Sequence, residues 1–143
     1  MKYFILAVLL ISTIMAKSVE LKTQDFLNGK VSNNKGDTTD TWIVKFFNPG
    51  CPHCKRFAKD WDDVANKLSD QGVNYGHVNC VKERPACERF NIWGVPTVLV
   101  FKDNHLEEYQ GSYDYDSLSK YIINRNYDTS GLSERAAVPQ NMY

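Results

Sequence analysis

The sequence predicts an α/β fold in a single domain. The apolar pattern changes between a two-residue and a 3.6-residue period several times, which is typical of alternating strands and helices rather than a helical bundle or a β-sandwich. The apolar run 42–47 is followed by a turn at 48–50 and then by apolar residues at helical spacing. With 143 residues, the chain can bury one moderate core and has no room for a second domain.

The N-terminal half is expected to contain two strands and two helices. The predicted order is a short strand 19–21, a short helix 24–27, a polar loop 28–41, a buried strand 42–47 and a helix from about 51 to 69. The last helix is amphipathic because Phe57, Trp61, Val64 and Leu68 recur on one face. The loop is assigned on its content of Asn, Lys, Asp and Gly.

The C-terminal half continues the alternation. The predicted order is a strand 73–78, a short helix 85–90, a buried strand 97–101, a turn 102–104, a partner strand 106–110 and a closing helix 114–125. Pro85 fits the first turn of its helix, and Asp114 or Asp116 lies near the start of the closing helix, where acidic groups are favoured.

The two ends of the chain differ from the domain between them. Residues 1–16 predict a secretory signal peptide, because Lys2 precedes the apolar run 3–11 and the small Ala16 offers a cleavage site. An uncleaved signal anchor is less favoured, since the run is shorter than the ~20 residues that span a bilayer. The domain is placed at 17–126, and the polar, aperiodic tail 127–143 is expected to be disordered.

These features predict a compartment and exclude some partners. The formal net charge is zero, so nothing in the composition recruits nucleic acid, and no membrane span is expected after signal cleavage. The chain ends in Asn141-Met142-Tyr143 and lacks a retrieval signal of the Lys-Asp-Glu-Leu type. The expected location is the secretory pathway, either the lumen of the endoplasmic reticulum or outside the cell.

The most informative motif is Cys51-Pro52-His53-Cys54, at the start of a predicted helix. Unpaired backbone N–H groups and the helix dipole stabilise a thiolate there, and the thiolate is the nucleophilic form. Cys51 is therefore predicted to attack disulfides, and Cys54, one turn later, to resolve the mixed disulfide. The alternatives are a static disulfide or half of a zinc site. Zinc needs four ligands, and six residues separate Cys80 from Cys87, so redox chemistry is favoured.

The chain resembles the protein disulfide isomerase family, as a single thioredoxin-like domain. The resemblance rests on the run 46–55 around the dithiol, Trp61, Asn79-Cys80, Cys87 and Gly94-Val95-Pro96-Thr97. It implies a thioredoxin-like fold with a central mixed sheet of four or five strands flanked by helices. It also implies a cis Val95–Pro96 bond beside the dithiol, with the Val95 backbone pairing with an extended substrate. Cys80 and Cys87 match the second pair of the family, which is read as core thiols or a structural bridge rather than as catalysts.

Several positions depart from the family pattern. Gly50 replaces a tryptophan beside the attacking sulfur, and Pro52-His53 is similar to the dipeptide of a bacterial periplasmic oxidant. His53 is expected to place positive charge near Cys51. Lys45 occupies a position that usually holds a buried acid, and it is expected to favour the thiolate. Tyr113 stands where a tuning arginine is common, and Lys59 replaces a helix proline.

Other aromatic and histidine side chains receive simpler interpretations. Trp61 is assigned to packing between helix and sheet, and Trp93, just before Gly94, to the border of a substrate groove or to plain surface exposure. His77 and His105 are expected on the surface.

The resulting hypothesis is a thiol–disulfide oxidoreductase, acting as an oxidase or isomerase on cysteine-containing polypeptides that fold in the secretory pathway. Glutathione or an upstream oxidase is a candidate redox partner, and no organic or metal cofactor is expected. The alternative is a thioredoxin-fold binding or chaperone module with little turnover, which Gly50, Lys45 and Tyr113 leave open. A binder would survive the loss of both active-site thiols, whereas an enzyme would not.

Overall fold

A computed structural model describes residues 18–27, 30–31, 41–102 and 105–128. The predicted signal peptide and residues 129–143 of the predicted tail lie outside the described residues. In the described part, no helix combines the length and the apolar character needed to cross a membrane.

A five-stranded mixed sheet forms the centre of the molecule, with the strand order β1-β5-β4-β6-β7. The strands are β1 (Ser18–Glu20), β4 (Trp42–Phe47), β5 (Asn74–Asn79), β6 (Thr97–Lys102) and β7 (His105–Glu108). β1, β5 and β4 run parallel, while β6 and β7 add antiparallel strands. The predicted α/β class and mixed sheet are confirmed, and the sheet has five strands.

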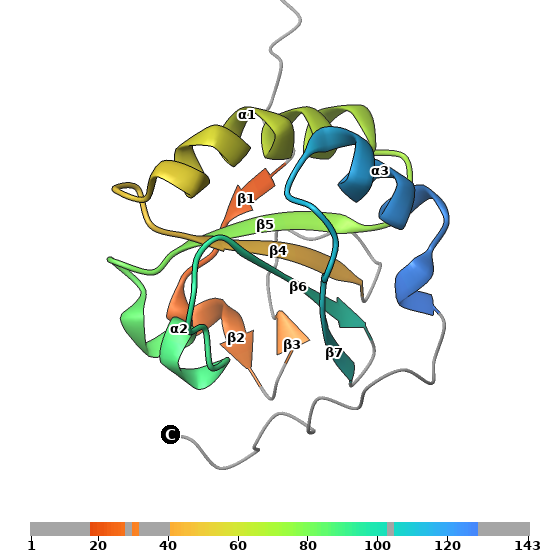
Figure 1. Ribbon diagram of the computed structural model, residues 1–143. Coiled ribbons are helices and arrows are strands. Elements are labelled where there is room, and N and C mark those ends of the chain that lie inside the picture. The colour runs from red at the N-terminus through yellow and green to blue at the C-terminus, as the bar shows by residue number, and fades with distance from the viewer. Residues whose placement is uncertain (1–17, 28–29, 32–40, 103–104, 129–143) are drawn as a thin grey trace, which may run out of the picture.

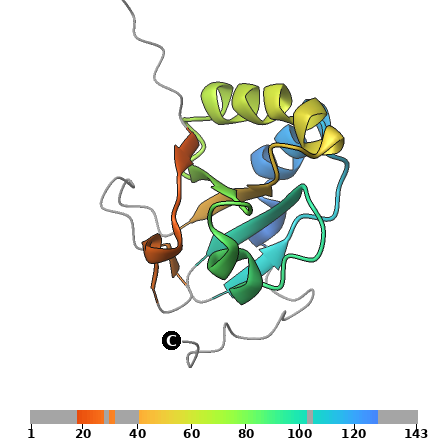
Figure 2. The same cartoon turned by 90° about the vertical axis from the view of Figure 1, so that its left-hand side faces the viewer.

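Helices cover both faces of the sheet (Figures 1 and 2). α1 (Pro52–Lys67) and α3 (Tyr115–Ile123) lie on one face, while α2 (Arg84–Arg89) lies on the other face with the 3₁₀ turn Thr23–Asp25. Each face buries its own apolar cluster. Phe57 and Trp61 of α1 pack on one face, and Phe26 and Phe90 pack on the other.

β4 is buried on both faces, which explains its continuous apolar run. Ile43 belongs to the cluster under α1, whereas Trp42, Val44 and Phe46 belong to the opposite cluster. Because side chains alternate along a strand, Lys45 shares the α1 face with Ile43. The fold thus places one buried cation in the layer beneath the helix that begins at the dithiol.

Two local predictions were wrong. The segment 24–27 was expected to be a helix, but it contains the end of the 3₁₀ turn and β2 (Phe26–Leu27). β2 pairs antiparallel with β3 (Lys30–Val31), which lies inside the predicted loop 28–41. Strands of two residues are too short to produce a period, and the aromatic contacts of Phe26 with Phe90 and Phe101 hold this segment against the sheet.

The start of the predicted disordered tail also needs correction. Residues Asn126–Asp128 form a 3₁₀ turn, and Tyr127 is buried in the cluster under α1. The polar residues on both sides of Tyr127 hid this contact from an argument based on composition.

Candidate active site

The dithiol lies where β4 ends and α1 begins. Asn48 shapes the connection, because its backbone carbonyl accepts from the N–H of Cys51 at 3.1 Å and its side-chain oxygen accepts from the N–H of Gly50 at 2.8 Å. Cys51 is the N-cap of α1, and Pro52 occupies the first turn, where no N–H is needed. Both thiols are free; Cys51 is half-buried, and Cys54 is only 4% exposed. The structure therefore brings the two predicted cysteines together with one sulfur open to solvent.

The sulfur of Cys51 is surrounded by hydrogen-bonding groups. It accepts from the backbone N–H of Cys54 at 3.3 Å, and its thiol can donate to the backbone carbonyl of Val95 at 3.6 Å. The pKa of Cys51 is lowered, first by a hydrogen bond from the Cys54 thiol and then by the N–H of Cys54. The N–H of His53 and the charge of Arg56 lower this pKa further. These contacts favour the Cys51 thiolate, as the position at the helix start predicts.

Cys54 has the opposite properties. Burial raises the pKa of Cys54, because a thiolate loses hydration in the interior, and the neighbouring Cys51 raises it further. A backbone hydrogen bond from Asn48 and the charge of Lys45 lower the same pKa. The two thiols therefore differ: the lowered pKa of Cys51 favours its nucleophilic thiolate, and the raised pKa of Cys54 favours its protonated thiol.

His53 is among the groups that lower the pKa of Cys51, but its contact is through the backbone rather than through the ring charge that the sequence suggested. A guanidinium can only donate hydrogen bonds, so the 2.6 Å contact between Arg56 Nη2 and His53 Nδ1 makes this ring nitrogen an acceptor. Its residue acts on Cys51 through the backbone N–H. The positive charge near Cys51 comes from Arg56, which the sequence analysis missed. The spacing of three residues from His53 is the signal that could have revealed it.

Lys45 is buried to 7% exposure beneath α1. Its ammonium lies 4.9 Å from the ring centroid of Phe47 and 5.7 Å from that of Trp61. Burial lowers the pKa of Lys45, while the charges of Asp62 and Cys54 raise it. Among the described groups, Lys45 acts on the ionisation of Cys54 but is not among the groups that shift Cys51. The expected thiolate-favouring charge is therefore directed at the resolving thiol.

His77 adjoins Lys45 and is half-buried, so its expected surface position was wrong. Its Nδ1 lies 2.8 Å from the hydroxyl of Ser18, which also accepts from the indole N–H of Trp61 at 2.9 Å. Burial is the main cause that lowers the pKa of His77, and the charge of Lys45 adds to it. Trp61 is fully buried between helix and sheet, as predicted.

The loop before β6 completes the site. The Val95–Pro96 bond is cis, as the resemblance implied, and the Val95 carbonyl contacts the reactive sulfur. Trp93, in the same loop, is 93% exposed. Tyr113 packs edge-on against Phe57, with ring centroids 5.2 Å apart, and so lies at the edge of the hydrophobic core.

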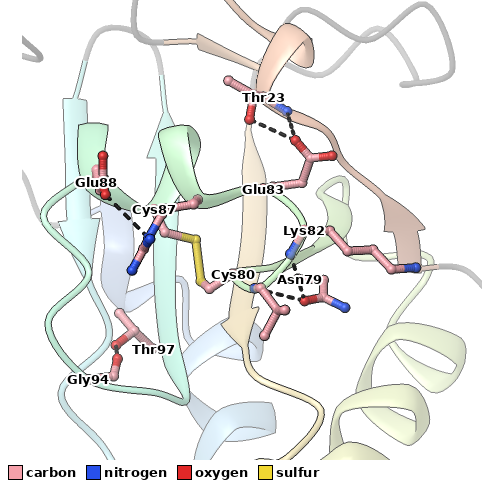
Figure 3. The surroundings of a disulfide bond; sticks show 11 residues. Thr23, Asn79, Cys80, Lys82, Glu83, Cys87, Glu88, Gly94 and Thr97 are labelled. Atoms are coloured by element: carbon pink, nitrogen blue, oxygen red, sulfur yellow. Dashed lines mark hydrogen bonds and ion pairs between the residues drawn. A yellow bond between two sulfur atoms is a disulfide. The ribbon is translucent and has the colours of Figure 1, made fainter.

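The second cysteine pair forms a disulfide (Figure 3). Cys80 directly follows β5 and Cys87 lies in α2, with their Cα atoms 5.8 Å apart. The surrounding turn is held by Asn79, whose side-chain oxygen accepts from the backbone of Val81 at 2.9 Å and of Lys82 at 3.3 Å. Of the two readings for this pair, the bridge is the one found. Within the described ranges, no group of three or more His, Cys, Asp or Glu side chains could hold a metal ion.

Comparisons with known proteins agree with this architecture. Residues 18–124 match the family model described as Thioredoxin. Protein disulfide-isomerase like 2-2 of Arabidopsis thaliana is 34% identical over 119 residues, covering 82% of this chain and 25% of the relative. Protein disulfide isomerase-like 2-3 of Oryza sativa subsp. japonica is 42% identical over 126 residues, covering 86% of this chain and 26% of the relative.

A solved structure shows the same fold. The first thioredoxin domain of mouse Protein disulfide-isomerase A4 superposes with a TM-score of 0.66 at 20% identity, over 87% of this chain and 89% of that domain. The chain spans about a quarter of the length of the two plant relatives, so the likeness to them concerns one domain. The chain belongs to the thioredoxin family, as a single thioredoxin domain with relatives of the protein disulfide-isomerase type.

Proposed function

We propose that the chain is a thiol–disulfide oxidoreductase that oxidises or isomerises cysteine-containing polypeptides folding in the secretory pathway. The observation that carries this proposal is the asymmetry of the dithiol. Cys51 is half-exposed with a lowered pKa, while Cys54 is buried with a raised pKa. An exchange catalyst needs one accessible nucleophile and one reserved thiol, whereas a structural pair needs neither.

In the oxidising direction, a client thiolate attacks the Cys51–Cys54 disulfide at the sulfur of Cys51. A client–Cys51 bond forms, the Cys51–Cys54 bond breaks, and Cys54 leaves as a thiolate that takes up a proton. A second client thiolate then attacks the client sulfur of the mixed disulfide. The client gains a disulfide, and the two electrons remain on the dithiol.

In the isomerising direction, the reduced Cys51 thiolate attacks an incorrect client disulfide and releases one client thiolate. If the client does not rearrange, Cys54 loses its proton and attacks Cys51, which frees the client in reduced form. Lys45 assists here because its charge favours the Cys54 thiolate. The reaction uses only sulfur exchange, so the proposal invokes no cofactor.

The electrostatics favour an oxidant over a reductant. Backbone N–H groups and Arg56 stabilise the Cys51 thiolate of the reduced form, and a more stable reduced form makes the disulfide easier to reduce. Glutathione disulfide, which is itself reduced to two glutathione thiols, or an upstream oxidase would restore the Cys51–Cys54 disulfide. The apolar N-terminal run supports entry into the secretory pathway, with residence in the endoplasmic reticulum or secretion.

The test is a trapping experiment on three variants of the full chain: Cys54→Ser, Cys51→Ser and the double substitution. Cys54→Ser retains the nucleophile and lacks the escape thiol, so it is expected to accumulate client mixed disulfides. Cys51→Ser is expected to trap almost none. Equal trapping by both single variants would contradict the assignment of the nucleophile. Full protection of client folding by the double variant would favour a binding module instead.

A further inference from the structure

Trp93 is unusually exposed for a large aromatic residue, because 93% of its surface is accessible to solvent. Large aromatic side chains normally bury most of their surface, and exposed apolar surface beside a reactive centre is typical of an interaction site. The other two tryptophans of the chain, Trp42 and Trp61, are 4% and 0% exposed. The chain therefore presents a single tryptophan to solvent.

The backbone that carries Trp93 is held at both ends. The N–H of Ile92 donates to the carbonyl of Cys87 at 2.9 Å, and Cys87 is bridged to Cys80 at the end of β5. On the other side, the hydroxyl of Thr97 donates to the carbonyl of Gly94 at 2.6 Å (Figure 3). The disulfide and this hydroxyl thus fix the loop against the sheet. The indole is exposed on an ordered support, which reduces the entropy lost when a ligand binds.

Trp93 belongs to the loop that contacts the reacting sulfur. The carbonyl of Val95 contacts Cys51 Sγ at 3.6 Å, and Trp93 precedes Val95 by two residues. Two residues of chain span at most about 7 Å, so the backbone of Trp93 lies within about 7 Å of that of Val95. A polypeptide joined to Cys51 can therefore reach this part of the loop with a residue about two positions from its own cysteine.

Small residues leave the approach open. A Cβ atom placed on Gly94 would meet no atom within 4 Å, and one on Gly50 would meet only the side-chain oxygen of Asn48. Val95 and Pro96, which follow in the same loop, are half-buried apolar residues. None of Trp93, Val95 and Pro96 carries a charge, so this part of the loop suits an apolar side chain better than an acidic or basic one.

We propose that Trp93 binds an apolar or aromatic side chain of the client, located within about two residues of the reacting cysteine. The substrate class is then unfolded polypeptide segments in which a cysteine has an apolar neighbour, because such segments are buried in a folded protein. This inference rests on the proposed oxidoreductase function and adds a preference among its clients. Trp93 acts by positioning the client and takes no part in sulfur exchange.

The kinetic test compares two peptides, each with two cysteines, that differ only in phenylalanine or serine two residues from one cysteine. The oxidised wild type is expected to oxidise the phenylalanine peptide with a kcat/KM about tenfold higher than that for the serine peptide. A gain of this size is what a well-placed aromatic contact provides. Trp93→Ala should remove this preference through a higher KM at similar kcat, and Trp93→Phe should retain most of it. Ile123→Ala truncates another exposed apolar residue, at the end of α3, and should leave the preference intact.

Glutathione separates this inference from the proposed function, since it carries no apolar side chain. Reduced glutathione should reduce the oxidised forms of the wild type and of Trp93→Ala at equal rates. If neither reacts, the oxidoreductase proposal itself fails. If both react and Trp93→Ala keeps the phenylalanine preference, the role of Trp93 is contradicted. It is also contradicted if Trp93→Ala loses reactivity with glutathione by the same factor as with the phenylalanine peptide.

Binding can also be measured without chemistry. In the Cys51→Ser/Cys54→Ser variant, acrylamide should quench mainly Trp93, because the other two indoles are buried. The phenylalanine peptide is expected to protect this fluorescence from quenching at lower concentration than the serine peptide. Equal protection by both peptides would overturn the inference.

Discussion

The substitution Lys45→Met tests whether the buried cation controls the resolving thiol. Methionine fills a similar volume without charge, so the aromatic surroundings of Phe47 and Trp61 remain packed. Removing the charge removes one of the two influences that lower the pKa of Cys54, while burial continues to raise it. The pKa of Cys54 therefore rises further, and less of this thiol is ionised near neutral pH.

The size of the kinetic effect follows from two opposing factors. For each unit by which a thiol pKa rises, the thiolate fraction falls about tenfold, but the nucleophilicity of the thiolate increases about threefold. The net slowing is about threefold per unit. A neighbouring opposite charge typically changes a pKa by about one to two units. The resolving step of Lys45→Met should therefore be roughly threefold to tenfold slower than in the wild type.

The assay isolates that step by loading Cys51 with a chromogenic aromatic thiol as a mixed disulfide. Release of the thiol then reports the attack by Cys54. Lys45→Met should slow this release and move its pH profile to higher pH, because the lost cation favoured the thiolate. Lys55→Met is the matched control, since Lys55 adjoins Cys54 in the chain but is exposed. Unchanged release and an unchanged pH profile in Lys45→Met would refute the reasoning.

Two further predictions concern charge and pH. Arg56→Gln should raise the pKa of Cys51, measured by the ultraviolet absorbance of the thiolate. His53→Gln should change this pKa less, because His53 acts through its backbone N–H. A larger effect from His53→Gln would identify the histidine as the source of charge. His77 takes up a proton less readily in the folded than in the unfolded state, because burial and Lys45 lower its pKa. Its contribution to stability is therefore complete above about pH 6.5 and is lost as the pH falls through the folded pKa. His77→Gln should flatten the fall in urea-unfolding free energy below pH 6.5, and an unaltered slope would assign the acid sensitivity to other groups.

The longer elements could be predicted from the sequence because each carries its own periodic signal. Strand 42–47 has the predicted bounds, and α1 begins directly after Cys51, as the motif indicated. The two-residue strands around Phe26 could not be predicted, since their pairing is fixed by aromatic contacts with residues far along the chain. Tyr127 was missed for the same reason: its burial depends on tertiary packing rather than on its polar neighbours.

The candidate site shows a similar division. The dithiol and the cis Val95–Pro96 bond follow from motifs and resemblance, and both lie where they were expected. The source of charge could not be read from the motif alone, because the hydrogen bond between Arg56 and His53 depends on side-chain directions. Likewise, the sequence placed Lys45 near the dithiol but gave no means of deciding which of the two sulfurs its charge would influence.

The most direct test of the account is the reduction potential of the Cys51–Cys54 pair, measured in defined glutathione buffers with the pKa of Cys51. The Cys51–Cys54 disulfide is expected to form and break reversibly, with a Cys51 pKa below that of an ordinary cysteine. Its potential should be less negative than the value of about −270 mV for thioredoxin. A pair that does not exchange with glutathione would contradict the oxidoreductase proposal. Reversible exchange at or below the thioredoxin value would contradict the assignment as an oxidant and favour a reductase.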